Sequence, residues 1–133
     1  MENTFQHKIK FIAKEFILEK KDWETKMIEK DVTFKELTYN DKSQTDIFQM
    51  LFPLFDEPTS ANKKKLRFNV DPKILTDITI EYIETSIVCD EDFTESHKTE
   101  LLNDRLAIIA LSNWLVNNKF APFFLDFVKN YLI

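Results

Sequence analysis

The chain has 133 residues, a length that suits one domain able to bury a core of its own. Apolar residues make up 44% of it and charged residues 31%, which are ordinary values for a soluble globular protein. The sequence contains no Gly, so the Gly-rich Walker A and Rossmann phosphate-binding fingerprints are both excluded. A formal net charge of −5 disfavours general nucleic-acid binding, which needs a basic surface.

Cysteine usage and the first residues bear on the cellular compartment. Cys89 is the single cysteine, so neither an internal disulfide nor a CxxC site can form. Charges at Glu2, Lys8 and Lys10 interrupt the region where a signal peptide would be apolar. The longest uncharged run, residues 106–118, is too short to span a bilayer. We therefore expect a cytoplasmic protein (in the host cytoplasm if it is phage-encoded) that does not contact a membrane.

The first two predicted elements differ in their hydrophobic period. Residues 3–20 predict an N-terminal helix within residues 1–21, because apolar side chains recur at helical spacing. These side chains are Phe5, Ile9, Ile12 and Phe16. The alternation in KIKFIA is a competing strand signal. Residues 22–37 favour a small β-hairpin in which DWETKMI pairs with VTFKEL, and a helix that continues with a polar break is the alternative.

The middle of the chain predicts a helix followed by a loop. Several N-cap candidates follow Thr38, and DIFQMLFPLF then places Ile47, Leu51 and Phe55 on one helical face. Pro53 limits this helix, because an interior proline removes a backbone donor. Residues 56–69 predict a loop. Without glycine, turns that need a positive φ are expected to use asparagine or aspartate. The asparagine candidates are Asn40, Asn62, Asn69, Asn103, Asn117 and Asn118.

The second half of the chain predicts three helices. Asp71-Pro72 combines a capping residue with proline at the first helical position, and begins a helix that runs to Cys89. Residues 90–96 form an acidic loop, with Thr94 or Ser96 as the cap of the next helix. Residues 101–118 are apolar on most sides, which is typical of a central core helix, and Asn117-Asn118 is its predicted stop.

The last segment carries aromatic side chains at helical spacing, which we call the C-terminal stripe. Its members are Phe120, Phe123, Phe124, Phe127 and Tyr131. The stripe has two interpretations: its side chains close the core, or they form a surface that binds a partner. Together the elements predict a mainly α fold, a single-domain bundle of about five helices over residues 1–133. In this prediction the small hairpin occupies residues 22–37 and the helical core residues 38–133.

No residues stand at the spacing of a catalytic or metal site. In an EF-hand loop counted from Asp90, the positions that need Gly and Glu are Glu95 and Leu101, so the pattern fails. His7 and His97 each lack a second histidine or cysteine at ligand spacing. We therefore expect a non-enzymatic protein that needs no cofactor and no metal.

Two segments resemble phage tail assembly chaperones. A charged N-terminal segment is followed by a strand-like unit that ends in FKELTYND and by an amphipathic helix, and this order is similar to that family. The later segment DRLAIIALSNWLVNNKFAPFF is similar to its C-terminal helices. The resemblance covers most of residues 23–127 and rests on the order of the elements and on their general residue pattern. It implies a protein that binds aggregation-prone tape-measure protein, or the tail-tube subunit, during virion assembly.

The leading hypothesis is therefore a phage-type tail assembly chaperone that shields an unassembled tail component. We expect it to bind no nucleic acid, and a homo-oligomer is possible. The residues expected to bind its protein partner are Ile47, Leu51, Phe55, Phe120, Phe123, Phe124, Phe127 and Tyr131. One alternative is a small acidic phage inhibitor of a host defence or nucleic-acid-binding protein, acting through carboxylates of the acidic loop. These are Asp90, Glu91, Asp92 and Glu95. A second alternative is a small structural subunit of a virion or secretion machine.

Overall fold

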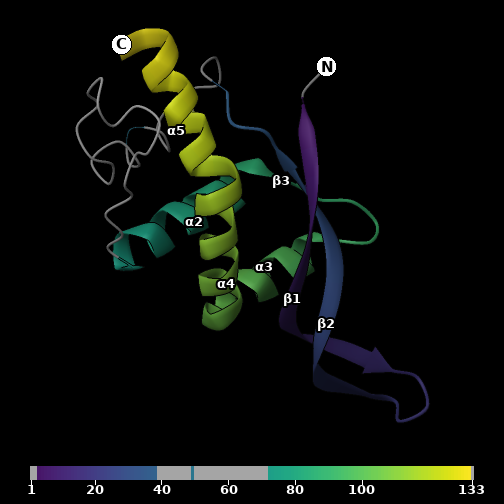
Figure 1. The fold of residues 1–133 in the computed structure, drawn as a ribbon. Helices are drawn as coiled ribbons and strands as arrows, with labels where there is room; N and C mark the ends of the chain where they lie inside the picture. The colour runs from purple at the N-terminus through teal and green to yellow at the C-terminus, as the bar shows by residue number, and fades with distance from the viewer. Residues whose placement is uncertain (1–2, 39–48, 50–71, 133) are drawn as a thin grey trace.

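The structure, a computed structural model, describes residues 3–38, 49 and 72–132 and has an α+β layout (Figure 1). Its elements in chain order are β1 (Thr4–Ile17), β2 (Asp22–Lys35), α2 (Pro72–Ser86), β3 (Ile87–Val88), α3 (Glu95–Asn103), α4 (Arg105–Leu115) and α5 (Ala121–Phe127). Two π-helical turns, Val116–Phe120 and Val128–Leu132, precede and follow α5. The strands form one antiparallel sheet in the order β1-β2-β3. The predicted mainly α bundle was therefore wrong.

The N-terminal segment is a strand, so the helix predicted within residues 1–21 was also wrong. Phe5 and Ile9 lie on the inner face of β1, whereas Ile12 and Phe16 lie on the outer face. The helical spacing therefore joined residues from two faces of one strand. The period of two in KIKFIA is the one that the fold uses, because alternate side chains of a strand point to opposite faces.

β1 and β2 form one long hairpin. Thr4 lies opposite Lys35 and Ile17 lies opposite Asp22, so all fourteen residues of each strand are paired. A strand at residues 22–35 was foreseen in part, since DWETKMI and VTFKEL are both extended. Their predicted pairing with each other was wrong, because they belong to one continuous strand whose partner is β1.

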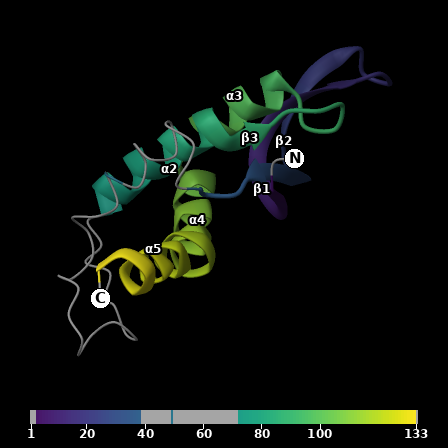
Figure 2. The ribbon, with the colours of Figure 1, turned by 90° about the horizontal axis from the view of Figure 1, so that it is seen from above.

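The core lies between the inner face of the sheet and the helices, which cover one side of it (Figures 1 and 2). The strands contribute Ile9, Phe11, Ala13, Ile28, Val32 and Phe34, all of them buried. The helices and their connections contribute large side chains that include Ile78, Tyr82, Ile83, Phe93, Leu101, Ile108, Leu115, Phe120 and Phe124. The Tyr82 hydroxyl donates to the carbonyl of Lys35 at 2.6 Å, so the largest polar side chain in the core keeps a partner.

The helical half follows the sequence prediction with three corrections. The helix that begins at Pro72 ends at Ser86, and Ile87 and Val88 form β3 against β2. The helix expected over residues 101–118 is broken at Asp104, whose extended backbone ends α3 and begins α4. The predicted stop at Asn117-Asn118 was wrong, because a π-helical turn carries the chain from α4 into α5. Pro122 is the second residue of α5, where a helix tolerates a missing N–H better than in its interior.

Positive φ values fall elsewhere than expected. Among residues 3–38, 49 and 72–132, Lys21 in the β1–β2 turn is the non-glycine residue with a positive φ, of 52°. Asn103, Asn117 and Asn118 lie in helical segments, while Asn40, Asn62 and Asn69 lie outside the described residues. The expectation that asparagine supplies this geometry was wrong where the structure tests it.

Candidate functional site

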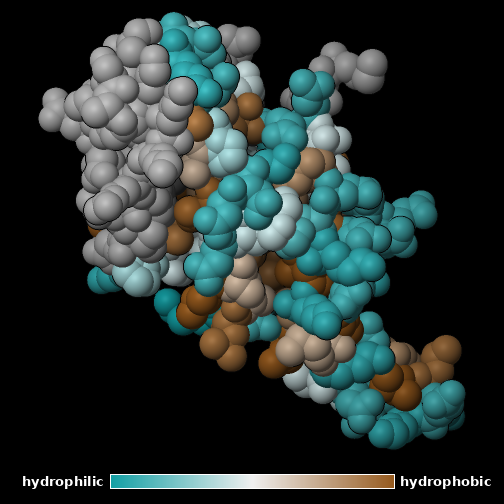
Figure 3. Space-filling model, in the orientation of Figure 1, coloured by the Kyte–Doolittle hydropathy of each residue, from teal (hydrophilic) through white to brown (hydrophobic). Residues whose placement is uncertain are grey.

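Large apolar side chains gather at the end of the β1–β2 hairpin, which projects away from the helices (Figures 1 and 2). The register places Ile12 opposite Met27 and Phe16 opposite Trp23, on the outer face of the sheet. Leu18 lies in the adjoining turn and is 80% exposed. We call these residues the hairpin-end patch: Ile12, Phe16, Leu18, Trp23 and Met27. Brown apolar surface appears at this end of the molecule in Figure 3.

Two aromatic side chains of the patch contact each other. The Phe16 and Trp23 rings meet edge to face, with centroids 5.6 Å apart and an interplanar angle of 65°. Trp23 nevertheless remains 63% exposed and Met27 60% exposed. Aromatic pairs of this geometry stabilise each other by about 0.5–1.5 kcal/mol beyond their buried area. The two rings therefore form a preformed apolar surface in contact with water.

An open cleft of about 660 Å³ lies between the hairpin end and α3. Its lining comes from Lys14, Trp23 and Thr25 of the hairpin and from Ser96, His97 and Glu100 of α3. Within the described part of the chain, neither Lys14 nor Glu100 takes part in an ion pair. The cleft thus places one cationic and one anionic group beside an exposed indole ring.

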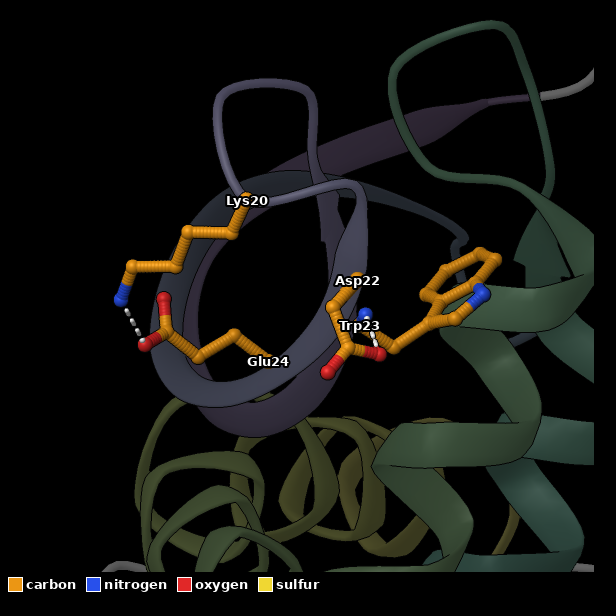
Figure 4. A network of polar contacts seen from close by, with 4 residues as sticks. All are labelled: Lys20, Asp22, Trp23 and Glu24. Carbon is orange, nitrogen blue, oxygen red and sulfur yellow. Dashed lines mark hydrogen bonds and ion pairs between the residues drawn. The ribbon is translucent and has the colours of Figure 1, made fainter.

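An ion pair at the hairpin turn and the Trp23 side chain lie on opposite sides of the ribbon (Figure 4). Lys20 Nζ lies 2.9 Å from Glu24 Oε1, and the Trp23 side chain points to the opposite side of the ribbon. The Asp22 carboxylate accepts the Trp23 backbone N–H at 2.8 Å and so holds the first residue of β2. Lys26 and Glu15 form a further exposed pair at 2.8 Å. Exposed pairs of this kind contribute little to stability. The turn itself is closed by backbone hydrogen bonds from Lys20 to Ile17 and from Lys21 to Leu18, at 3.1 and 3.3 Å.

His97 is a structural residue at the edge of the cleft. Its Nδ1 accepts the Thr94 backbone N–H at 3.0 Å, while Thr94 Oγ1 accepts the His97 N–H, which completes a capping box for α3. Partial burial lowers the pKa of His97, and the nearby Lys30 charge lowers it further. The neutral imidazole that results is the form that can accept the Thr94 N–H. The capping role predicted for Thr94 is confirmed.

His7 is the second histidine with an altered environment. Its ring stacks on Trp114 with centroids 3.7 Å apart, and the accompanying burial lowers its pKa. Neither histidine joins a group of metal-ligating side chains, and no such group occurs among the described residues. Both rings serve packing between the sheet and the helices.

The structure divides the residues predicted to bind a partner into three groups. Phe120 and Phe124 are buried in the core, at 0% and 1% exposed, so they stabilise the fold. Phe123 and Phe127 are half-buried, and Tyr131 is exposed with its ring stacked on Phe127. The C-terminal stripe is therefore core at its first turns and surface at its last turn. Ile47, Leu51 and Phe55 lie outside the described residues.

The acidic loop proposed for the inhibitor alternative uses one of its carboxylates internally. Asp90 Oδ1 accepts the backbone N–H groups of Asp92 and Phe93, each at 2.8 Å. Glu91, Asp92 and Glu95 are exposed. Asp90 therefore orders the loop, and Phe93 packs from it into the core against Phe11.

The hairpin-end patch was missed by the sequence prediction. Ile12 and Phe16 were assigned to the apolar face of a helix, and Trp23 was assigned to a strand of the small hairpin. The alternation in KIKFIA was the signal that pointed to the outer face. It was outweighed because four apolar residues also matched the helical period.

The comparisons with known proteins add no relative. No family model, no curated protein and no solved structure matches this chain. Within the part that the structure describes, no helix is both long enough and apolar enough to cross a bilayer. What the chain does must be argued from its own α+β fold and from the hairpin-end patch.

Proposed function

We propose that this protein is a non-enzymatic binding module that covers an apolar segment of another protein. The observation that carries the proposal is the hairpin-end patch, in which five large apolar side chains remain in contact with water on an ordered hairpin. Contiguous exposed apolar surface usually marks a place of interaction, because leaving it in water has a free-energy cost. Met27 and the paired aromatic rings supply the adaptable and rigid contacts that such surfaces use.

Within this class, the specific proposal is a tail assembly chaperone that shields an unassembled tail component. Two things support it: the resemblance in FKELTYND and in DRLAIIALSNWLVNNKFAPFF, and an exposed apolar surface suited to an aggregation-prone partner. The proposed contact residues move from the buried rings Phe120 and Phe124 to the hairpin-end patch. Binding there resembles other modes in which an amphipathic segment lays its apolar side on an exposed surface.

The test is co-expression with a tape-measure fragment that is insoluble alone. We expect the wild-type chain to keep the fragment soluble and Trp23→Ser combined with Met27→Ser to lose most of this effect. Leu106→Ser on α4 is the matched control, because Leu106 is 79% exposed and lies outside the patch. Phe124→Asp would be uninformative, since it places a charge in the core.

Two outcomes would count against the proposal. If no tail component is kept soluble by the wild-type chain, the chaperone assignment fails. If the fragment stays soluble with the Trp23 and Met27 variant but not with Leu106→Ser, the binding surface lies on α4 and the patch has no part in it.

A further inference from the structure

The outer edge of β2 is open along most of its length. β3 pairs with Thr33 and Phe34 only, although β2 extends from Asp22 to Lys35. No other described strand lies beside β2 on that side. An unpaired strand edge is a template for another strand, because its N–H and C=O groups lack partners.

Two hydrogen bonds show which residues of the hairpin turn their backbone groups toward the partner strand and which turn them away. The Glu36 N–H donates to the Asn3 carbonyl at 2.9 Å, and the Ile12 N–H turns away from β2 to reach Asp104 Oδ2 at 2.8 Å. Because bonding alternates along an antiparallel pair, odd residues of β2 turn their N–H and C=O groups outward. The pairing of Thr33 with Val88 of β3 agrees with this phase. The outward-facing residues on the open edge are Trp23, Thr25, Met27, Glu29 and Asp31, of which Trp23 already donates its N–H to the Asp22 carboxylate.

The side chains along this edge select against a generic apolar strand. Lys26 and Lys30 stand on the inner face, where an added apolar strand would have to pack beside two ammonium groups. Inward-pointing charges of this kind are a common protection of sheet edges. Lys26 is already paired with Glu15 at 2.8 Å, so a strand that pairs here must offer a carboxylate opposite Lys30.

We propose that the strand that pairs with this edge is β2 of a second copy of this chain. An antiparallel two-fold pairing centred on Met27 uses the outward N–H and C=O groups from Thr25 to Glu29, and at its ends the Trp23 carbonyl can accept the Asp31 N–H. It places Glu24 of each copy opposite Lys30 of the other on the inner face. Lys30 forms no ion pair within the described chain, and the exposed Glu24 carboxylate can bind Lys30 in addition to Lys20.

The charges also fix the register of this pairing. If the partner strand is shifted by two residues in one direction, Lys26 of one copy lies opposite Lys26 of the other. If it is shifted by two residues in the other direction, Lys26 of one copy lies opposite Lys30 of the other. Like charges directly opposite each other destabilise a strand pair. The Met27-centred register avoids both and places the two Met27 side chains together on the outer face. The hairpin-end patches of the two copies then lie on one continuous sheet.

This pairing is independent of the proposed function, because it uses the backbone edge of β2 and does not require a foreign partner. Sedimentation equilibrium of the full chain is expected to show a concentration-dependent dimer. Thr25→Pro should raise the dimer Kd by at least about tenfold, because it removes an outward N–H from each side of the pairing. The same variant should keep its far-UV circular dichroism, since the Thr25 N–H takes no part in the β1–β2 ladder. Lys26→Pro is the matched control, because its N–H faces β1 and its loss should lower the melting temperature.

A charge exchange tests the register. Glu24→Lys and Lys30→Glu should each weaken the dimer, and the two together should restore it. A wild-type chain that stays monomeric up to about 1 mM would overturn the proposal. A dimer that resists Thr25→Pro but is lost with Trp23→Ser would also overturn it, because the copies would then meet through the outer face.

Discussion

Lys21 is the residue where the backbone of the hairpin carries a cost. Its φ of 52° lies in the left-handed region, which costs a residue with a Cβ roughly 1–2 kcal/mol. Lys21→Gly removes this cost but gives the unfolded chain more freedom, so we expect a net gain of up to about 1 kcal/mol in the free energy of unfolding. Urea denaturation measures the gain. Lys21→Ala keeps a Cβ and should change stability by less than about 0.5 kcal/mol, so an equal gain from alanine would contradict the explanation.

His97 predicts a pH dependence of stability. Burial and the Lys30 charge lower its pKa in the folded state below the ordinary value of 6.5, so the unfolded chain binds more protons in the interval between the two pKa values. The contribution of His97 to stability is therefore complete above pH 6.5 and is lost as the pH falls through the lowered pKa. His97→Gln keeps an acceptor for the Thr94 N–H and should flatten this loss in thermal melts.

The pH experiment needs a second variant, because burial also lowers the pKa of His7. His7→Gln should remove a separate part of the same loss, and the double variant should remove most of it. A wild-type melting temperature that stays constant from about pH 7.5 to about pH 5 would contradict both assignments.

At the scale of the element, local signals in the sequence located the helices better than the strands. Pro72 and Thr94 marked helix starts correctly, because capping chemistry depends on a few adjacent residues. β1 could not be assigned in the same way, since Phe5, Ile9, Ile12 and Phe16 fit a helical period while KIKFIA alternates. The strand forms because β1 pairs with residues 22–35. A pattern within residues 4–17 alone does not reveal that pairing.

Asp104 is the residue that joins three elements. Its Oδ1 accepts the Ala107 N–H and caps α4, while its Oδ2 accepts the Ile12 N–H on the edge of β1. Asp104→Ala removes both acceptors and should lower the free energy of unfolding by about 2 kcal/mol. Asp104→Asn retains only one oxygen, whichever way its amide lies, so it should lose about half as much.

Two measurements distinguish this role from a general effect of charge. Chemical denaturation should leave Asp77→Ala within about 0.5 kcal/mol of the wild type, since Asp77 is an exposed acidic residue on α2. Hydrogen exchange at the Ile12 amide should speed up in Asp104→Ala more than exchange at Phe11, whose N–H faces β2. Equal exchange rates at Ile12 in the wild type and in Asp104→Ala would show that this bond does not hold β1.

At the scale of the whole molecule, the hairpin has two halves. One half contributes side chains to the core, and the other projects beyond it. Every fully buried side chain of the sheet lies at or before Ala13 in β1 and at or after Ile28 in β2. Beyond these positions, side chains are half-buried or exposed, and the contacts are exposed ion pairs and one aromatic pair. The half next to the helices therefore supplies the buried side chains, while the projecting half displays apolar surface outside the core.

This division predicts that the hairpin can be shortened without unfolding the protein. Ala13 and Lys26 lie directly opposite each other, so an Asn-Gly turn can replace residues 14–25 and close the same ladder. We expect the free energy of unfolding to change by no more than about 1 kcal/mol, since exposed pairs contribute little. The shortened chain should melt cooperatively but should no longer keep a tape-measure fragment soluble. If it unfolds instead, the projecting half belongs to the folding unit, and its apolar side chains would need an explanation in stability.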